Sequence, residues 1–229
     1  MTDQTFAVCE SCPAEGTVEL PPVGTLGPLL CPICHGLMTI VDIEPWRAAV
    51  EARVQRKAAL VAGKALGTRR QSRRQSDTAI DRDGLEAELA ACLLLCPGYR
   101  AQWLESGGPN RGADLPAAWT LLGKPVEVKA TRHYSGRHGH LLVRPPRWTP
   151  GAMRPAYIED CLYVLMLVQG TLQTLLGWTD RKHFLTHGAL NPVPVHAGQR
   201  ECWGIHWSHL LRPRLLVRLL PTPSNEATG

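Results

Sequence analysis

Four cysteines near the amino terminus constrain the fold of this chain more than any other feature. They form two Cys-x2-Cys pairs, Cys9 with Cys12 and Cys31 with Cys34, separated by 18 residues. Two pairs at this spacing are typical of a tetrahedral zinc site with four thiolate ligands. Such a site has no open position for water, so we expect zinc to be structural and its binding to be coupled to folding.

The segment between the two pairs is rich in glycine and proline, which suits short strands and turns. Over about residues 5–42 the pattern resembles a zinc ribbon. Ribbons dock on nucleic acids or on proteins. Between Cys9 and Pro45, however, every charged residue is acidic, and His35 is the one histidine. We therefore expect this module to bind a protein partner or to brace the following helix rather than to bind phosphates.

The composition is that of a globular protein, because 44% of the 229 residues are hydrophobic and 20% are charged. No apolar run is long enough to span a membrane, and the first ten residues have no basic stretch followed by an apolar one, so we expect neither a membrane segment nor a secretory leader. Cysteines in such a chain indicate reduced thiols and a cytoplasmic, intracellular location. Cys92, Cys96 and Cys161 are expected to be buried core thiols, and Cys202 is unassigned.

Positive charge is concentrated in residues 47–74. This segment holds nine basic side chains and one acidic side chain, a net charge of +8, and since the whole chain carries +5, the remainder carries −3. Apolar residues at helical spacing predict a helix over 45–65, followed by a flexible basic linker. Nucleic acid could bind there, although a solvated helix face with a solubilising tether explains the charge as well. The predicted contacts are Arg53, Lys57, Lys64, Arg69, Arg70, Arg73 and Arg74.

A helix with two glutamates opens the carboxyl-terminal part of the chain. The Ala- and Leu-rich segment 84–96 predicts this helix, with Asp83 as its N-cap. Glu88 lies nearer to the buried side of the helix than Glu86 does. The sequence leaves open which of the two glutamates serves a site.

A strand with a carboxylate and a lysine follows. In Val126-Glu127-Val128-Lys129 apolar and polar residues alternate, so Glu127 and Lys129 project together from one face. A hairpin from Asp114 would bring a second carboxylate beside Glu127, giving two hard oxygen ligands for a divalent cation. A surface ion pair is the simpler explanation of Glu-x-Lys on a strand.

This arrangement resembles the PD-(D/E)xK nuclease superfamily, whose signature is an acidic residue, a variable gap, and then acidic-x-Lys on the next strand. Here Asp114 is followed, after twelve residues, by Glu127-Val128-Lys129, and Ala113 stands in place of the namesake proline. The resemblance covers about residues 83–190. It implies an α/β fold with a restriction-endonuclease-like αβββαβ core.

By this resemblance, Asp114 and Glu127 would bind Mg²⁺ or Mn²⁺ together with the carbonyl of Val128. Glu88 would be an auxiliary helix carboxylate, and Lys129 would position or activate water. Such a cation offsets charge on the phosphorane oxygens and lowers the pKa of its bound water. The reaction implied is phosphodiester hydrolysis by a Mg²⁺-dependent (endo)deoxyribonuclease.

A stretch rich in basic and aromatic residues follows the motif, a composition suited to phosphate contact and base stacking. Arg132, His133 and Arg137 are predicted nucleic-acid contacts, because they follow Lys129 closely in the chain. Further on, the apolar segment 163–168 predicts a buried strand and residues 210–220 predict a terminal edge strand.

The sequence thus predicts an α/β protein in four parts: a zinc ribbon (1–44), a basic helix and linker (45–80), a nuclease domain (81–220) and a disordered tail (221–229). The expected partner is nucleic acid, DNA in preference to RNA, and a homodimer would supply the two active sites that cleavage of both strands usually requires. Two alternatives stay open. One is a non-enzymatic nucleic-acid-binding or transcription-regulating protein that docks through its ribbon, and the other is a zinc-stabilised scaffold that binds RNA through the basic helix.

Overall fold

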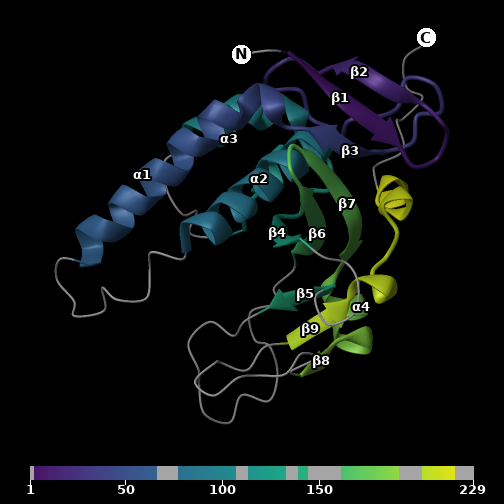
Figure 1. Cartoon of the computed structure of the whole chain (residues 1–229). Helices are drawn as coiled ribbons and strands as arrows, with labels where there is room; N and C mark the ends of the chain where they lie inside the picture. The colour runs from purple at the N-terminus through teal and green to yellow at the C-terminus, as the bar shows by residue number, and fades with distance from the viewer. Residues whose placement is uncertain are drawn as a thin grey trace.

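The computed structural model describes residues 3–65, 77–106, 113–132, 139–143, 161–190 and 203–219. Over these residues the protein is a mixed α/β structure built on a six-stranded sheet with the order β2-β1-β3-β7-β6-β4 (Figure 1). The strands of this sheet are β1 (Gln4–Cys9), β2 (Glu15–Glu19), β3 (Met38–Asp42), β4 (Val126–Thr131), β6 (Leu162–Gln169) and β7 (Leu172–Thr179). The α/β class predicted from the sequence is confirmed.

The cysteine-containing region supplies three of the six strands. β1 lies between β2 and β3 and pairs antiparallel with both. β3 also pairs antiparallel with β7, with Ile40 opposite Thr174. β6 and β7 form a hairpin, and β4 lies parallel to β6 at the edge of the sheet. The sheet is therefore continuous from the cysteine region to the Glu-x-Lys strand.

Four α-helices are described: α1 (Arg47–Ala65), α2 (Asp77–Leu95), α3 (Arg100–Glu105) and α4 (Arg181–His187). α1 follows a 3-10 turn over Glu44–Trp46, so the helix predicted over 45–65 is confirmed. The prediction that Asp83 caps the second helix is wrong, because that helix begins at Asp77 and the Asp83 carboxylate pairs with Arg132 instead. Among the described residues, none of the helices has the length and apolar character needed to cross a bilayer.

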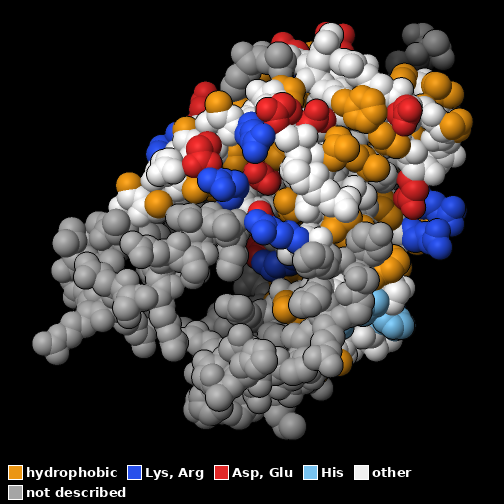
Figure 2. Space-filling model, viewed as in Figure 1, with side chains coloured by type: hydrophobic (Ala, Val, Ile, Leu, Met, Phe, Trp, Pro, Cys, Tyr) orange, Lys and Arg blue, Asp and Glu red, His pale blue; other side chains and the backbone are white. Residues whose placement is uncertain are grey.

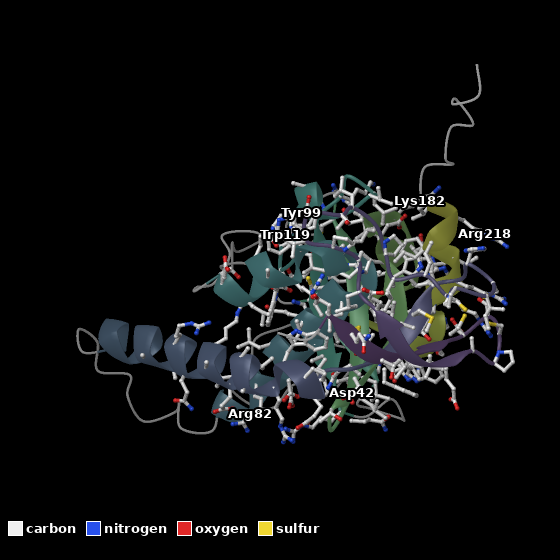
Figure 3. All side chains as sticks on the ribbon, turned by 90° about the horizontal axis from the view of Figure 1, so that it is seen from above. Asp42, Arg82, Tyr99, Trp119, Lys182 and Arg218 are labelled. Atoms are coloured by element: carbon white, nitrogen blue, oxygen red, sulfur yellow. The ribbon has the colours of Figure 1, made fainter. Side chains whose placement is uncertain are left out.

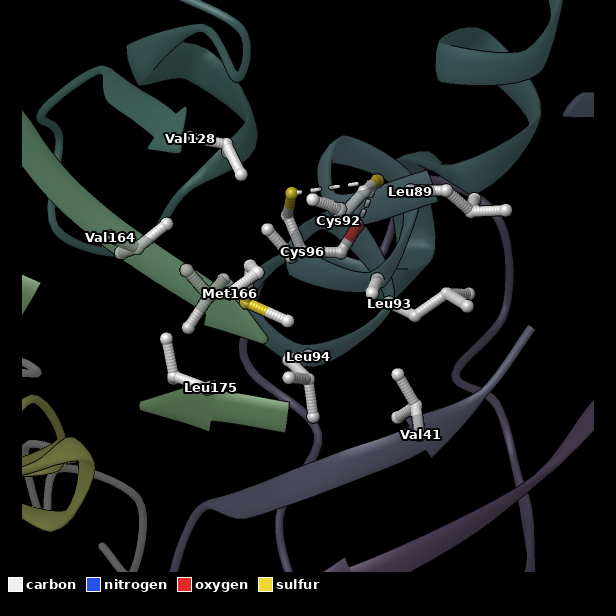
Figure 4. Packing of buried hydrophobic residues seen from close by; sticks show 14 of the residues in the cluster. Val41, Leu89, Cys92, Leu93, Leu94, Cys96, Val128, Val164, Met166 and Leu175 are labelled. Carbon is white, nitrogen blue, oxygen red and sulfur yellow. Dashed lines mark hydrogen bonds between the residues drawn. The ribbon is translucent and has the colours of Figure 1, made fainter. Parts of the chain in front are cut away.

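The largest hydrophobic core lies between α2 and one face of the sheet. Leu89, Leu93 and Leu94 of α2 are fully buried, and Val128 of β4 and Val164 of β6 point toward the same helix (Figure 4). This burial follows from the sequence, because the broad apolar side of α2 covers the alternate residues of the strands. Cys92, Cys96 and Cys161 are buried, as predicted.

The cysteine region and α2 belong to one packed unit. Buried residues of the region, such as Val41 and Cys31, lie in the same core cluster as α2 and β6. The backbone N–H of Leu29 donates to the carbonyl of Leu94 at 2.7 Å, at the carboxyl end of α2. The sequence-based boundary between residues 44 and 45 therefore falls inside a single core rather than between two separately packed modules.

A smaller layer packs against the ends of β6 and β7, on the side of β6 that faces away from α2. It consists of a three-stranded sheet, β5 (His140–Val143), β9 (Trp203–His206) and β8 (Ala189–Leu190), together with α4 (Figure 1). Tyr163 and Leu165 of β6 pack there against Phe184 of α4. The predicted buried strand over 163–168 is confirmed as β6. The terminal strand predicted over 210–220 is wrong: Pro213 begins a 3-10 turn, and a second turn follows at Val217–Leu219.

Candidate functional site

The four predicted zinc ligands lie together beside β1 and β3. All four Sγ atoms lie within 4.8 Å of one another, with 3.5 Å between Cys9 and Cys34 and 3.6 Å between Cys12 and Cys31. Each Cys-x2-Cys pair forms a turn that directs both sulfurs inward. The four cysteines can hold a zinc ion, and their donor set of four thiolates fits that metal.

Backbone N–H groups point at these sulfurs. The N–H groups of Ser11, Ile33 and Gly36 donate to Cys9, Cys31 and Cys34 respectively, at 3.3–3.4 Å. The backbone N–H of Cys34 also lowers the pKa of the Cys31 thiol to about 7. Dipoles that stabilise thiolates in this way favour binding of a cation.

Cys9 and Cys12 hold their protons more strongly than Cys31 does. Desolvation raises the pKa of Cys9. Although the backbone N–H of Ala14 lowers the pKa of Cys12, hydrogen bonds with the thiols of Cys34 and Cys31 raise it to about 12. Zinc binding would therefore release protons from the cluster.

The second set of predicted site residues lies at the opposite end of the sheet, on the edge strand β4. Leu115 and Val126 exchange two backbone hydrogen bonds of 2.9 Å in an antiparallel bridge. Asp114 precedes Leu115, so the bridge brings it to the edge of the strand that carries Glu127. A cation site shared by Asp114 and Glu127 stays a prediction.

The peptide groups of Val128 point toward the same open edge. The carbonyl of Pro125 accepts from Leu162 of β6, whereas both peptide groups of Val126 bond to Leu115 on the other side. Because backbone orientation alternates along a strand, Val128 shares the direction of Val126. Its N–H donates to Oδ2 of Asp114 at 2.8 Å. The Val128 carbonyl is consequently directed to the side where Asp114 lies.

Lys129 completes this edge. Its Nζ lies 2.5 Å from Oε1 of Glu127, and the two side chains remain 30% and 26% exposed. Val126 and Val128, which alternate with them, are buried under α2. Glu127 and Lys129 therefore project from the face of the sheet that α2 does not cover.

An aromatic pair holds the loop that carries Asp114. Trp119, between Leu115 and β4, stacks on Tyr99, with 5.6 Å between ring centroids and 14° between ring planes (Figure 3). Tyr99 belongs to the 3-10 turn Pro97–Tyr99 that follows α2. This stacking fixes the loop against the end of α2 and so helps to place Asp114 at the strand edge.

The structure distinguishes the two helix glutamates. Glu88 is 17% exposed and lies 3.8 Å from the guanidinium of Arg53, and this guanidinium is also attracted electrostatically to Asp114. Glu86 instead faces Asp83, and burial together with the Asp83 charge raises the pKa of Glu86. Glu88 is therefore the helix carboxylate that pairs with Arg53, whereas Glu86 lies beside a hollow that Asp83 also lines.

Among the described residues, the four cysteines form the only group of three or more Cys, His, Asp or Glu side chains whose ligand atoms converge closely enough to hold a metal. Glu88, Asp114 and Glu127 do not form such a group. A cation at the strand edge would thus rest on Asp114, Glu127 and the Val128 carbonyl, while Glu88 would act from a greater distance. This smaller set of hard oxygen donors fits Mg²⁺ or Mn²⁺, which usually retain several waters.

The predicted nucleic-acid contacts have different outcomes. Arg53 is only 5% exposed, so its predicted role as a surface contact is wrong: its guanidinium is held inside the protein by Trp103 and Glu88. Arg132 is exposed but forms two hydrogen bonds with Asp83, at 2.6 and 2.9 Å. The remaining predicted contacts lie outside the residues or side chains that the structure describes; they are Lys57, Lys64, Arg69, Arg70, Arg73, Arg74, His133 and Arg137.

A polar hollow beside α1 and α2 was not predicted. It has a volume of about 290 Å³ and is bordered by Arg47, Arg82, Arg132, Asp83 and Glu86, together with the turn between β6 and β7. Arg47 pairs with Glu44 and Arg82 pairs with Glu51. Lys and Arg atoms accordingly lie among Asp and Glu atoms on the face drawn in Figure 2, and no extended patch of one sign is visible there.

No protein-family model matches this chain, and no curated protein or solved structure matches it either. The functional argument therefore rests on the geometry of the two ends of the sheet.

Proposed function

We propose that the protein is a metal-dependent nuclease with a restriction-endonuclease-like core, that it cleaves phosphodiester bonds of DNA, and that a structural zinc ion holds its amino-terminal ribbon. The observation that carries this proposal is the strand edge. There the Leu115–Val126 bridge brings Asp114 to the edge of β4, the backbone N–H of Val128 donates to Asp114, and Lys129 pairs with Glu127. The helix α2 before the motif and the parallel strand β6 after it also suit an αβββαβ core.

The chemistry follows from these groups. A Mg²⁺ or Mn²⁺ ion held by Asp114, Glu127 and the Val128 carbonyl would lower the pKa of a bound water and offset charge on the phosphate oxygens. The ammonium group of Lys129 would stabilise the attacking hydroxide. Glu127 orients this ammonium group through their contact of 2.5 Å. Glu88 would hold further water molecules at the site from α2.

Cleavage of plasmid DNA, single-stranded DNA and RNA in Mg²⁺ or Mn²⁺ tests the proposal. Asp114→Asn and Lys129→Ala should each lower the cleavage rate by about 10²-fold or more, since each removes a group that stabilises the transition state. Lys182→Ala is the matched control, because Lys182 is an exposed lysine on α4. Equal cleavage by wild type and Lys129→Ala would refute the mechanism.

The second candidate function is non-enzymatic binding, with the ribbon docked on a protein. It is favoured by exposed apolar side chains around the cysteine turns, among them Val23 at 58% and Ile33 at 73% exposure. This candidate predicts no divalent-dependent cleavage of any nucleic acid. It also predicts that Asp114→Asn and Lys129→Ala bind nucleic acid as the wild type does, which an electrophoretic mobility shift would measure.

A further inference from the structure

Arg53 is an arginine of the basic helix α1 whose charge is directed inward. Its side chain is 6% exposed. The guanidinium carbon lies 3.9 Å from the ring centroid of Trp103, and Nη1 donates to Oγ of Ser106 at 2.9 Å and to the carbonyl of Trp103. Trp103 belongs to α3, and Ser106 directly follows the last residue of that helix. Three contacts from this one short segment therefore fix the guanidinium in place.

The fixed guanidinium lies beside Glu88, one of the carboxylates of the proposed active site. Nη2 lies 3.8 Å from Oε2 of Glu88 on α2. Burial lowers the pKa of Arg53, and the negative charges of Glu88 and Asp114 oppose this effect. A buried charge is costly unless opposite charges compensate it, and these two carboxylates provide that compensation.

Three other charges bear on this arrangement. Arg56, one turn further along α1, repels the guanidinium and donates to the carbonyl of Leu104 at 3.3 Å. Glu127 and Lys129 lie beyond Asp114 on the edge strand and pair with each other. Arg53 is thus a buried cation that contacts Glu88 and is attracted electrostatically to Asp114.

We propose that Arg53 is a positioning residue of the nuclease site: anchored on Trp103 and Ser106, it orients Glu88 toward the strand edge and offsets the negative charge of Glu88 and Asp114. This inference rests on the proposed function. It assigns α1 a role inside the site in addition to any contact with nucleic acid. Because a nearby positive charge opposes binding of a cation, Arg53 also lowers the affinity of the proposed β4 site for divalent metal ions.

Two substitutions separate the charge of Arg53 from its shape. In zinc-loaded full-length protein, Arg53→Met should bind Mn²⁺ about 3- to 10-fold more tightly in calorimetry, since the opposing charge is gone. Arg53→Lys keeps the charge but loses the planar fork, so its Mn²⁺ affinity should stay within about twofold of wild type. Both variants should cleave DNA at least about 10-fold more slowly, because Glu88 is no longer oriented.

Arg47→Met is the control, since Arg47 lies on the same helix with a 66% exposed side chain. It should change neither the Mn²⁺ affinity nor the cleavage rate beyond about twofold. A folded Arg53→Met protein with wild-type Mn²⁺ affinity would overturn the inference, because a purely structural arginine would not affect that affinity.

Should Arg53→Met fail to fold, Glu88→Gln tests the same point. Without the negative charge of Glu88, less of the positive charge of Arg53 is neutralised, so Arg53 should repel the metal ion more strongly. The Mn²⁺ affinity should therefore fall by about 3-fold or more. Unchanged affinity would overturn the inference. Failure of the proposed function gives a different result: wild-type protein would then show neither Mn²⁺ binding sensitive to Asp114→Asn nor divalent-dependent cleavage.

Discussion

The two ends of the six-stranded sheet differ in the metal chemistry that we assign to them: a cluster of four cysteines at one end and a proposed divalent-cation site at the other. Beside β1 and β3, four thiols converge within 4.8 Å and would surround an ion completely. At β4, Asp114 accepts from the backbone N–H of Val128 at an edge that is paired only through the isolated Leu115–Val126 bridge, and Glu127 lies on the same strand. Soft sulfur donors in a closed set suit zinc, while a few hard oxygens with open positions suit Mg²⁺ or Mn²⁺.

This difference shows how one sheet can separate stability from chemistry. A closed site contributes folding energy and leaves no position for water or substrate. An open edge contributes little to folding, but it can present a bound water to a phosphodiester. The two ends share one core, so the closed site should stabilise the strand on which the open site is built.

The largest effect is expected from removing a sulfur ligand. Cys31→Ser should abolish stoichiometric zinc binding and lower the stability of the whole protein by at least ~3 kcal/mol, or the Tm by roughly 10 °C. The reason is that Cys31 lies in the core cluster that also contains α2 and β6. Zinc content by elemental analysis and thermal unfolding by circular dichroism measure these effects.

Cys161→Ala is the matched control, because this buried thiol lies outside the cluster. It should retain zinc and lose only about 1 kcal/mol. If Cys31→Ser instead unfolds in two separate transitions, with the second at the wild-type temperature, the two ends are independent and the comparison fails.

A smaller effect is expected at the contact between the ribbon and α2. A Cβ atom at Gly98 would lie 2.2 Å from the carbonyl oxygen of Thr25 and 2.7 Å from its nitrogen. The backbone hydrogen bond from Gly24 to Gly98 holds this contact closed. Gly98→Ala should therefore cost ~2–4 kcal/mol, as overpacking against backbone does, and denaturant unfolding measures it.

Gly84→Ala supplies the control for this substitution. Gly84 lies inside α2, and a Cβ there would meet nothing within 4 Å. This variant should gain about 0.5–1 kcal/mol, because alanine favours a helix interior over glycine. Equal stability of the Gly98→Ala and Gly84→Ala proteins would contradict the close packing of the ribbon on α2.

Local patterns in the sequence were sufficient to predict several parts of the structure. The cysteine cluster follows from spacing, because each Cys-x2-Cys turn brings its own two sulfurs together. The shared face of Glu127 and Lys129 follows from strand alternation, and the helix α1 follows from apolar periodicity. In each case, residues close together in the chain determine the outcome.

Long-range contacts could not be predicted in the same way. The pairing of β3 with β7 joins segments more than a hundred residues apart, and a strand pattern does not specify its neighbour. The burial of Arg53 depends on Trp103 and Glu88, which come from two later helices. One local signal was present, since Arg53 adjoins the buried Val50 and Val54 on the apolar side of α1.

The most direct test of the account is anomalous diffraction from crystals of the zinc-loaded protein soaked in Mn²⁺. The account predicts a zinc peak among the four sulfurs and a manganese peak at the edge of β4. The manganese should lie about 2.2 Å from oxygens of Asp114, Glu127 and the Val128 carbonyl, and its peak should be absent in Asp114→Asn crystals. A zinc peak with no manganese at that edge, at Mn²⁺ concentrations that support cleavage, would contradict it.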